Sequence, residues 1–232
     1  MAPMYANAYM YQYEMQYILQ RYDLHITRYF RFIDDILILW NGTKEEALQF
    51  TLGLNTLPTP VKMTSHVDEK SVQFLDVEIM IIDEKLEFRL FTKPTDRNTI
   101  LHFDSFHPRH LKTSLPSSQF LRVLRNNSLS QQCNLQLEAM YKKFWTRGYP
   151  RSILEVALKR AKMTHSTSEV RIGRATNTRL IFPMQFNTAS TEITSSIRKN
   201  WNTLAMDPTL PENFRQKPLF CYRRNRNLRD ML

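Results

Sequence analysis

The sequence predicts an α+β protein in which an antiparallel sheet with helices is followed by a helical, basic region. Three observations favour this fold class. Strand-like apolar runs are concentrated before residue 97, apolar residues at helical spacing dominate residues 98–206, and acidic residues give way to basic ones between these parts. A hydrophobic content of 42% with 12% aromatic residues in 232 residues is typical of a folded chain.

The elements of the first part follow one another closely. We expect a helix over residues 3–21, a β-hairpin over 28–40, and a helix that begins at a capping box and ends near residue 55. In this capping box, Thr43 and Glu46 satisfy each other's backbone donors. A strand over 61–66 comes next, and a strand over 71–82 with Val77, Ile79 and Ile81 facing inward turns into a last strand over 86–90.

The second part reads as helices with basic faces. We expect a helix over 107–127, a second one capped by Ser128 and Gln131, and a third over 152–163 with Lys159, Arg160 and Lys162 outward. A polar loop over 164–178, a strand over 179–185 and a helix over 188–204 follow, the last with Ile193, Ile197, Trp201 and Leu204 on its apolar side. Residues 207–232 read as a basic tail or linker whose arginines contact phosphate or belong to a disordered end.

The net charge of +10 is unevenly distributed. Residues 1–104 hold 15 acidic and 10 basic side chains, whereas residues 105–206 hold 4 acidic and 16 basic ones. This imbalance favours a polyanion such as nucleic acid as the partner of the second part. The same helices also fit a small bundle with a solvated basic face, so both interpretations stay open.

Several classes of protein find no support in the sequence. No apolar run of about eighteen residues and no signal-peptide pattern occurs, so we expect an intracellular protein without a membrane span. The chain has 4 glycines and no glycine-rich phosphate loop, which argues against ordinary NTPase and dinucleotide-binding folds. Cys133 and Cys221 lie far apart without metal-ligand spacing, so we take both as structural.

An unusual pair of carboxylates, Asp34 and Asp35, joins the two apolar runs of the predicted hairpin. Aspartate is a common turn residue, so the pair fits a solvated turn. Adjacent carboxylates also repel each other unless a hard cation neutralises them, so a divalent-metal site such as one for Mg²⁺ is the alternative, which the surrounding residues must decide.

The succession of motifs resembles the palm of a reverse transcriptase, and more narrowly that of Penelope-like retroelements. Residues 1–10 resemble the end of the family's motif B, residues 32–35 its motif C, the 61–65 strand its motif D, and residues 74–76 its motif E. The segments 91–98, 102–108 and 118–122 resemble the thumb with its helix-turn-helix-like unit, and residues 223–230 resemble the linker beyond it. The resemblance implies a partial polymerase palm over 1–97, a helical thumb over 98–206 and a tail over 207–232.

The resemblance also implies an activity and the residues that would serve it. Enzymes of this family are RNA-directed DNA polymerases of retrotransposons, which join a DNA primer to a dNTP on an RNA template with two Mg²⁺ ions. Asp34 would be the principal metal ligand and catalytic carboxylate, and Asp35 a secondary one. The residues expected near primer or template are Phe32, Gln73, Phe74, Leu75, Lys112, Arg122, Arg125, Lys142 and Lys143.

Two parts of the family's pattern are not found in this sequence. Motif A, which carries another metal-binding Asp, and the fingers precede motif B in the family, and the usual endonuclease domain follows the thumb. We therefore expect a truncated copy that does not polymerise DNA alone. Three hypotheses result: a fragment of a nuclear retrotransposon enzyme, a non-catalytic helix-turn-helix module that binds nucleic acid, or a structural protein that assembles through its palm surface.

Overall fold

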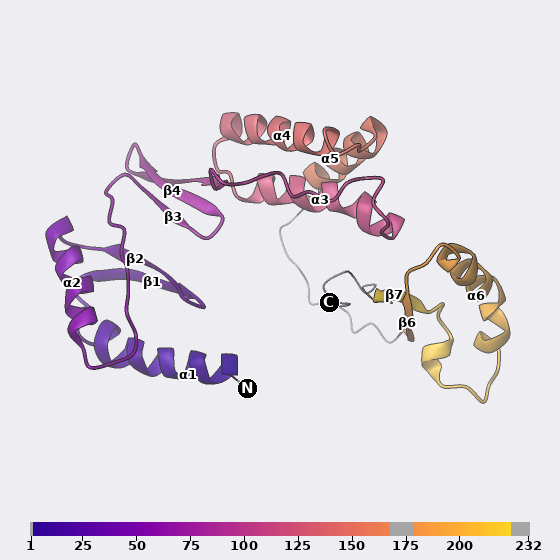
Figure 1. The fold of residues 1–232 in the computed structure, drawn as a ribbon, viewed down its shortest axis with the longest axis horizontal. Coiled ribbons are helices and arrows are strands. Elements are labelled where there is room, and N and C mark those ends of the chain that lie inside the picture. Colours follow the sequence, from indigo (N-terminus) through magenta and orange to yellow (C-terminus); the bar gives the residue numbers. More distant parts are fainter. Residues whose placement is uncertain (1, 168–178, 224–232) are drawn as a thin grey trace, which may run out of the picture. The chain divides into compact units, whose positions relative to one another are not determined.

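The computed structural model describes residues 2–167 and 179–223 (Figure 1). The chain divides into two units, each of which collects segments from separate parts of the sequence. Unit 1 comprises residues 1–99 and 122–140, and unit 2 comprises residues 100–121 and 141–232.

Helices and antiparallel strands both occur, as the α+β prediction requires. The α-helices are α1 Ala2–Glu14, α2 Lys44–Thr56, α3 Arg109–Arg125, α4 Ser130–Trp145, α5 Arg151–Ser166 and α6 Ser190–Ala205, with a π-helical segment η1 Met15–Leu19 and a 3-10 helix η2 Glu212–Phe214. The strands are β1 Ile26–Phe32, β2 Asp35–Trp40, β3 Ser71–Phe74, β4 Val77–Ile82, β5 Lys85–Leu90, β6 Ile181–Gln185 and β7 Leu219–Arg223.

The strands form three small sheets. β1 and β2 form an antiparallel hairpin, and β3, β4 and β5 form an antiparallel meander in that order. β6 and β7 pair in parallel, with α6 in the connection between them (Figure 1). The predicted antiparallel pairing is therefore confirmed for the first two sheets, while the third sheet was not expected.

A core within unit 1 joins α1, η1, the first hairpin and α2. Ile18 of η1 and Phe50 and Leu54 of α2 are buried together with Tyr13, and Trp40 of β2 packs against them. The ring of Trp40 lies 5.1 Å from that of Phe50. This core explains why a two-stranded hairpin, which is marginal in isolation, is stable here.

The capping box at the start of α2 is confirmed. The Thr43 N–H donates to the Glu46 carboxylate (2.8 Å), and the Glu46 N–H donates to the Thr43 hydroxyl (3.2 Å). The hydrogen bond from the Thr43 N–H lowers the pKa of Glu46. The sequence therefore positioned this helix start correctly.

The strand predicted over residues 61–66 is wrong, because this segment is irregular. Asn55 of α2 forms the hydrogen bonds to this segment that a neighbouring strand would otherwise form. Its side-chain amide donates to the Met63 carbonyl, and its oxygen accepts from the Met63 N–H, each at 2.7 Å. A side chain thus satisfies backbone groups that would otherwise need strand pairing.

The single strand predicted over residues 71–82 is in fact a hairpin. Leu75 has a positive φ of 55°, and with Asp76 it forms the turn between β3 and β4. Leucine is not a typical turn residue, so residue preferences do not indicate a turn at this position. Ile81 was expected to face inward but is 56% exposed, whereas Val77 and Ile79 are half-buried.

Unit 2 contains its own buried aromatic cluster. Phe120 of α3, Phe144 of α4 and Tyr149 in the turn before α5 are each almost fully buried, and so is the apolar Leu154 of α5. The rings of Phe144 and Tyr149 meet edge to face with centroids 4.9 Å apart. Burial raises the pKa of Tyr149.

The last elements also belong to unit 2. Trp201 of α6 is buried and donates its indole N–H to the Phe214 carbonyl at 2.9 Å. Ile193 and Leu204 were predicted on the buried side of this helix but are exposed, while Ser190 and Thr194 are buried instead. The arginines beyond Arg223 lie outside the described residues.

Within residues 2–167 and 179–223, none of the helices combines the length and apolarity needed to cross a membrane.

Candidate nucleic-acid interface

The turn between α4 and α5 directs the start of α5. Gly148 has a positive φ of 79°, a backbone conformation that residues with a Cβ rarely adopt. The next residue, Tyr149, is buried, and Pro150 is the N-cap residue, in an extended conformation, after which α5 begins at Arg151. This short, well-packed turn gives α5 a defined direction after α4.

The two faces of α5 differ in character. Leu154, Ala157 and Ala161 are buried at helical spacing. The opposite face carries the exposed cations Lys159, Arg160 and Lys162, as the sequence predicted. Their charges therefore lie where a ligand in solvent can reach them.

Another cation stands at the N-terminus of α5. The guanidinium of Arg151 lies over the ring of Trp145, 4.8 Å from its centre. Such stacking restrains the side chain near the surface. Arg151 was not among the predicted binding residues, and its only sequence signal is its place beside the turn.

The cations predicted to contact nucleic acid have different environments. Lys112 donates to the Ser105 carbonyl at 3.0 Å and lies over the ring of Phe103. Arg122 forms an ion pair of 2.5 Å with Asp76. Arg125 and Lys142 are exposed, whereas Lys143 is half-buried. Lys112 and Arg122 thus have internal partners in addition to any ligand.

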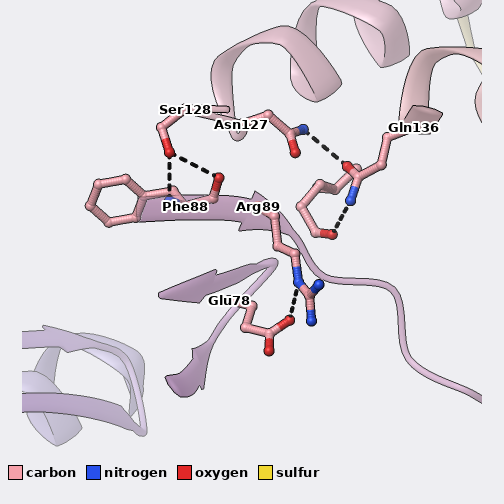
Figure 2. Close-up of polar contacts among 7 residues, drawn as sticks. Glu78, Phe88, Arg89, Asn127, Ser128 and Gln136 are labelled. Carbon is pink, nitrogen blue, oxygen red and sulfur yellow. Dashed lines mark hydrogen bonds and ion pairs between the residues drawn. The ribbon is translucent and has the colours of Figure 1, made fainter. Parts of the chain in front are cut away.

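The turn between α3 and α4 is attached to strand β5 within unit 1 (Figure 2). The Phe88 N–H donates to the Ser128 hydroxyl at 2.7 Å, and the Ser128 N–H donates to the Phe88 carbonyl at 3.0 Å. The Ser128 hydroxyl also donates to the carboxylate of Glu87. The predicted capping box of Ser128 with Gln131 is therefore wrong, because the hydroxyl is used in this tertiary contact.

Two amide side chains extend the same connection. Asn127 donates to the side-chain oxygen of Gln136 at 3.0 Å, and Gln136 donates to the Leu90 carbonyl at 2.9 Å (Figure 2). On the sheet, Arg89 pairs with Glu78 of β4 at 2.5 Å, and this bond raises the pKa of Arg89. The end of β5 is thus bonded both to the neighbouring strand β4 and to helix α4.

The predicted carboxylate pair lies at the tip of the first hairpin, as expected. Asp34 lies in the turn and Asp35 begins β2, opposite Phe32 in the register, and all three are exposed. Ile33 in the turn has a positive φ of 57°. Arg31 donates to the Ile33 carbonyl at 3.0 Å and so braces the turn that carries the carboxylates.

A buried acid connects this hairpin to α1. Glu14 is 6% exposed, forms an ion pair with Arg31, and accepts a hydrogen bond of 3.0 Å from the Tyr29 hydroxyl. Burial, followed by the charge of Glu14, raises the pKa of Tyr29. These contacts fix the hairpin relative to α1 but do not involve Asp34 or Asp35.

The residues predicted at the primer side lie on a different hairpin. Gln73 and Leu75 are exposed and Phe74 is half-buried, all at the end of β3. Among the residues that the structure describes, no three His, Cys, Asp or Glu side chains form a group that could hold a metal. Asp34 and Asp35 contribute two carboxylates at the hairpin tip, which is fewer than the three groups of such a set.

The outer face of α5 also carries two apolar residues that were not predicted to belong to the site. Val156 is 69% exposed and Met163 is 60% exposed, in the midst of the cations. With Lys159 and Arg160 they line a shallow surface hollow. The spacing of the three charges was visible in the sequence, whereas these two residues read as ordinary helix positions.

One comparison with known proteins gave a match. A family model described as the animal helix-turn-helix domain matches residues 99–159, which include α3, α4 and the first half of α5. Neither the search of curated proteins nor the search of solved structures gave a match.

Proposed function

We propose that the chain is a nucleic-acid-binding module whose contact surface is the outer face of α5. The observation that carries the proposal is the exposure of Lys159, Arg160 and Lys162 on a helix whose other face is buried. Lysine and arginine on such a face bind phosphate and release counterions, which provides affinity for any nucleic acid.

The similarity to a helix-turn-helix domain supports the same conclusion. In proteins of this type, a helix that follows a short turn after another helix is presented to the nucleic acid. Here the turn with Gly148 separates α4 from α5, and the matched residues 99–159 hold 9 basic and 3 acidic side chains. Both the geometry and the charge therefore suit a polyanion.

Binding is tested with the full chain and a fluorescently labelled 20-base-pair duplex in a salt series from 50 to 200 mM. With about four phosphate contacts we expect the logarithm of the association constant to fall with the logarithm of salt at a slope of about −4. Lys159→Ala and Arg160→Ala should each make the slope less steep by about 1. A flat salt dependence would contradict the proposal.

Lys44→Ala provides the matched control. Lys44 is an exposed lysine at the start of α2 in unit 1, away from the helix-turn-helix region in sequence. Its loss changes the net charge by the same amount as Lys159→Ala. If both variants changed the slope equally, the binding would reflect net charge rather than the face of α5.

As a second candidate, we propose that the chain derives from a reverse transcriptase of the Penelope-like type and that Asp34 and Asp35 served as Mg²⁺ ligands. The exposed carboxylate pair at a braced hairpin tip favours this proposal. A bound divalent ion would activate a primer hydroxyl and stabilise the leaving pyrophosphate. The two carboxylates fit part of such a site, so we expect no polymerisation by this chain alone.

Primer extension on an RNA template with Mg²⁺ and dNTPs tests this candidate, with Asp34→Ala beside the unchanged chain. Extension that the substitution abolishes would show that the chain is itself a polymerase. Weak Mg²⁺ binding that both Asp34→Asn and Asp35→Asn reduce, measured by calorimetry, would support a ligand role without activity. Mg²⁺ binding that neither variant changes would remove that role.

A further inference from the structure

We infer that α5 reads duplex DNA in the major groove and that Val156 and Met163 recognise thymine through its methyl group. This inference rests on the proposed nucleic-acid binding and specifies its substrate class. It begins from the mixed character of the exposed face of α5, which carries apolar side chains between cations.

The residues concerned form one stripe. Ser152, Val156, Lys159 and Met163 follow one another at spacings of four, three and four, so they share a face of the helix. From Val156 to Met163 the helix rises about 10 Å, which equals about three base-pair steps of DNA. Arg160 lies on one side of this stripe and Lys162 on the other, as expected for the 100° advance per residue.

In this arrangement the charged and the apolar side chains would contact different parts of the DNA. Cations at the edges of a helix reach the phosphates on either side of a groove, and these contacts position a protein without reading sequence. The apolar side chains at the centre would then face the base edges. In the major groove the only apolar group at a base edge is the C5-methyl of thymine, so Val156 and Met163 match thymine better than any other base.

The single acidic residue on this face, Glu155, is consistent with that placement. Glu155 is exposed one turn before Lys159. A carboxylate is repelled by phosphates, but it can accept a hydrogen bond from a cytosine amino group in the groove. Its position therefore favours a base edge over the backbone.

The shape of the groove selects DNA over RNA. The major groove of B-form DNA is about 12 Å wide and admits an α-helix. The corresponding groove of an A-form RNA duplex is deep and narrow, and side chains cannot read it. A helix that uses its central apolar side chains for contact thus requires B-form DNA.

Replacing thymine by deoxyuridine tests the inference, because the two bases differ only by the methyl group. The full chain is titrated with a 20-base-pair alternating A–T duplex, with the same duplex in which every thymidine is deoxyuridine, and with an RNA duplex of the same length. Burial of one methyl group corresponds to about a fourfold change in affinity. We expect the thymidine duplex to bind at least fourfold more tightly than the deoxyuridine duplex, and the RNA duplex to bind less tightly than both.

Two substitutions assign the effect to residues. Val156→Ser and Met163→Gln remove the apolar contact while keeping exposed helix positions, so each should reduce the preference for thymidine and leave the salt slope unchanged. Lys162→Ala, which removes an exposed cation beside the stripe, should do the opposite. Leu135→Gln serves as the matched control, because Leu135 is an exposed apolar residue of α4.

The outcomes separate this inference from the proposed function. Equal binding of the thymidine and deoxyuridine duplexes, with a steep salt dependence, would overturn thymine recognition and leave nucleic-acid binding intact. RNA binding as tight as DNA binding would overturn the groove assignment. Absence of binding to all three duplexes would remove both the inference and the function on which it rests.

Discussion

At the scale of single residues, the most demanding group in unit 1 is the buried carboxylate of Glu14. A buried acid is costly unless its charge is paired and hydrogen-bonded. Arg31 provides the opposite charge and Tyr29 provides a hydroxyl donor. Because Arg31 also donates to the Ile33 carbonyl, the Glu14–Arg31 ion pair is connected to the turn that contains Asp34.

Arg31→Met should therefore destabilise the protein by about 3 kcal/mol, since it leaves the Glu14 carboxylate buried without its partner. Urea unfolding followed by circular dichroism measures the change. Arg28→Met on the same strand is the control, because Arg28 is exposed, and it should change the stability by less than about 0.5 kcal/mol. Equal effects of the two variants would contradict a structural role for the buried pair.

Tyr29 gives the stability a dependence on alkaline pH. Burial raises the pKa of Tyr29, so the unfolded chain loses this proton at a lower pH than the folded chain. The stabilising contribution is thus complete below the ordinary tyrosine pKa of about 10 and is lost as the pH rises beyond it. Tyr29→Phe should reduce the fall of the urea midpoint between pH 9 and 11. Parallel curves for the two proteins would show that Tyr29 titrates normally.

At the scale of elements, the turn between α4 and α5 determines how the candidate interface is presented. A Cβ added at Gly148 would lie 3.3 Å from a ring carbon of His102, in addition to the unfavourable positive φ. The direction in which α5 begins thus depends on Gly148, which lies before the helix and outside the face that carries Lys159, Arg160 and Lys162.

Gly148→Ala should lower the stability by about 1–2 kcal/mol because of the left-handed backbone conformation. Thermal unfolding measures this change, and Gly148→Asn should be the milder of the two because asparagine tolerates that conformation. Gly53→Ala in α2 is the control. Gly53 is within a helix, and a Cβ added there would lie 3.9 Å from the Tyr22 hydroxyl, an ordinary van der Waals contact, so alanine there should stabilise the protein. A neutral Gly148→Ala variant would refute the importance of this turn.

One hydroxyl, that of Ser128, provides part of the contact between β5 and the α3–α4 turn. Ser128→Ala removes the acceptor of the Phe88 N–H, so the amide hydrogen of Phe88 should exchange with solvent at least tenfold faster. Ser118→Ala is the control, because the Ser118 hydroxyl donates to the Leu115 carbonyl within α3. Unchanged protection of Phe88, measured by hydrogen exchange with NMR, would mean that the strand is held by other contacts.

The elements with local signals were predictable from the sequence. The capping box of Thr43 and Glu46, the hairpin around Asp34 and the helices with regular apolar spacing depend on nearby residues alone. The turn at Leu75 and the contact of Ser128 were not predictable. The first uses a residue without turn preference, and the second depends on a strand 40 residues away.

The candidate interface was predicted in part for a similar reason. Helical periodicity identified the outward cations of α5. It could not show that Lys112 binds the Ser105 carbonyl or that Arg122 pairs with Asp76, since these partners come from other elements. It also gave no weight to Val156 and Met163, because exposed apolar residues are common on surfaces.

At the scale of the whole molecule, acidic and basic residues are segregated along the chain. The first 104 residues hold an excess of acidic side chains, and the following hundred hold a fourfold excess of basic ones. A polyanion should consequently be attracted to the second part rather than to the first.

Duplex DNA should therefore protect the amides of α5 from hydrogen exchange and leave those of β1 and β2 unchanged. Exchange followed by mass spectrometry on the full chain with a 20-base-pair duplex measures this pattern. The comparison at 500 mM salt is the control, because binding through phosphates should be lost there. Protection centred on residues 26–40 would instead favour contact at the carboxylate hairpin and the polymerase origin.

The parallel pairing of β6 with β7 has a consequence for biosynthesis. Ile181 pairs with Leu219, and α6 lies between them, so β6 leaves the ribosome a few seconds before its partner at about 5–20 residues per second. During this interval Ile181 and Phe182 have no strand beside them from β7. Pro183 stands in the middle of β6 and lacks an N–H, so one position of the waiting strand cannot donate a hydrogen bond to a neighbouring nascent chain. Pro183 thus disfavours pairing of β6 with another strand before β7 has been synthesised.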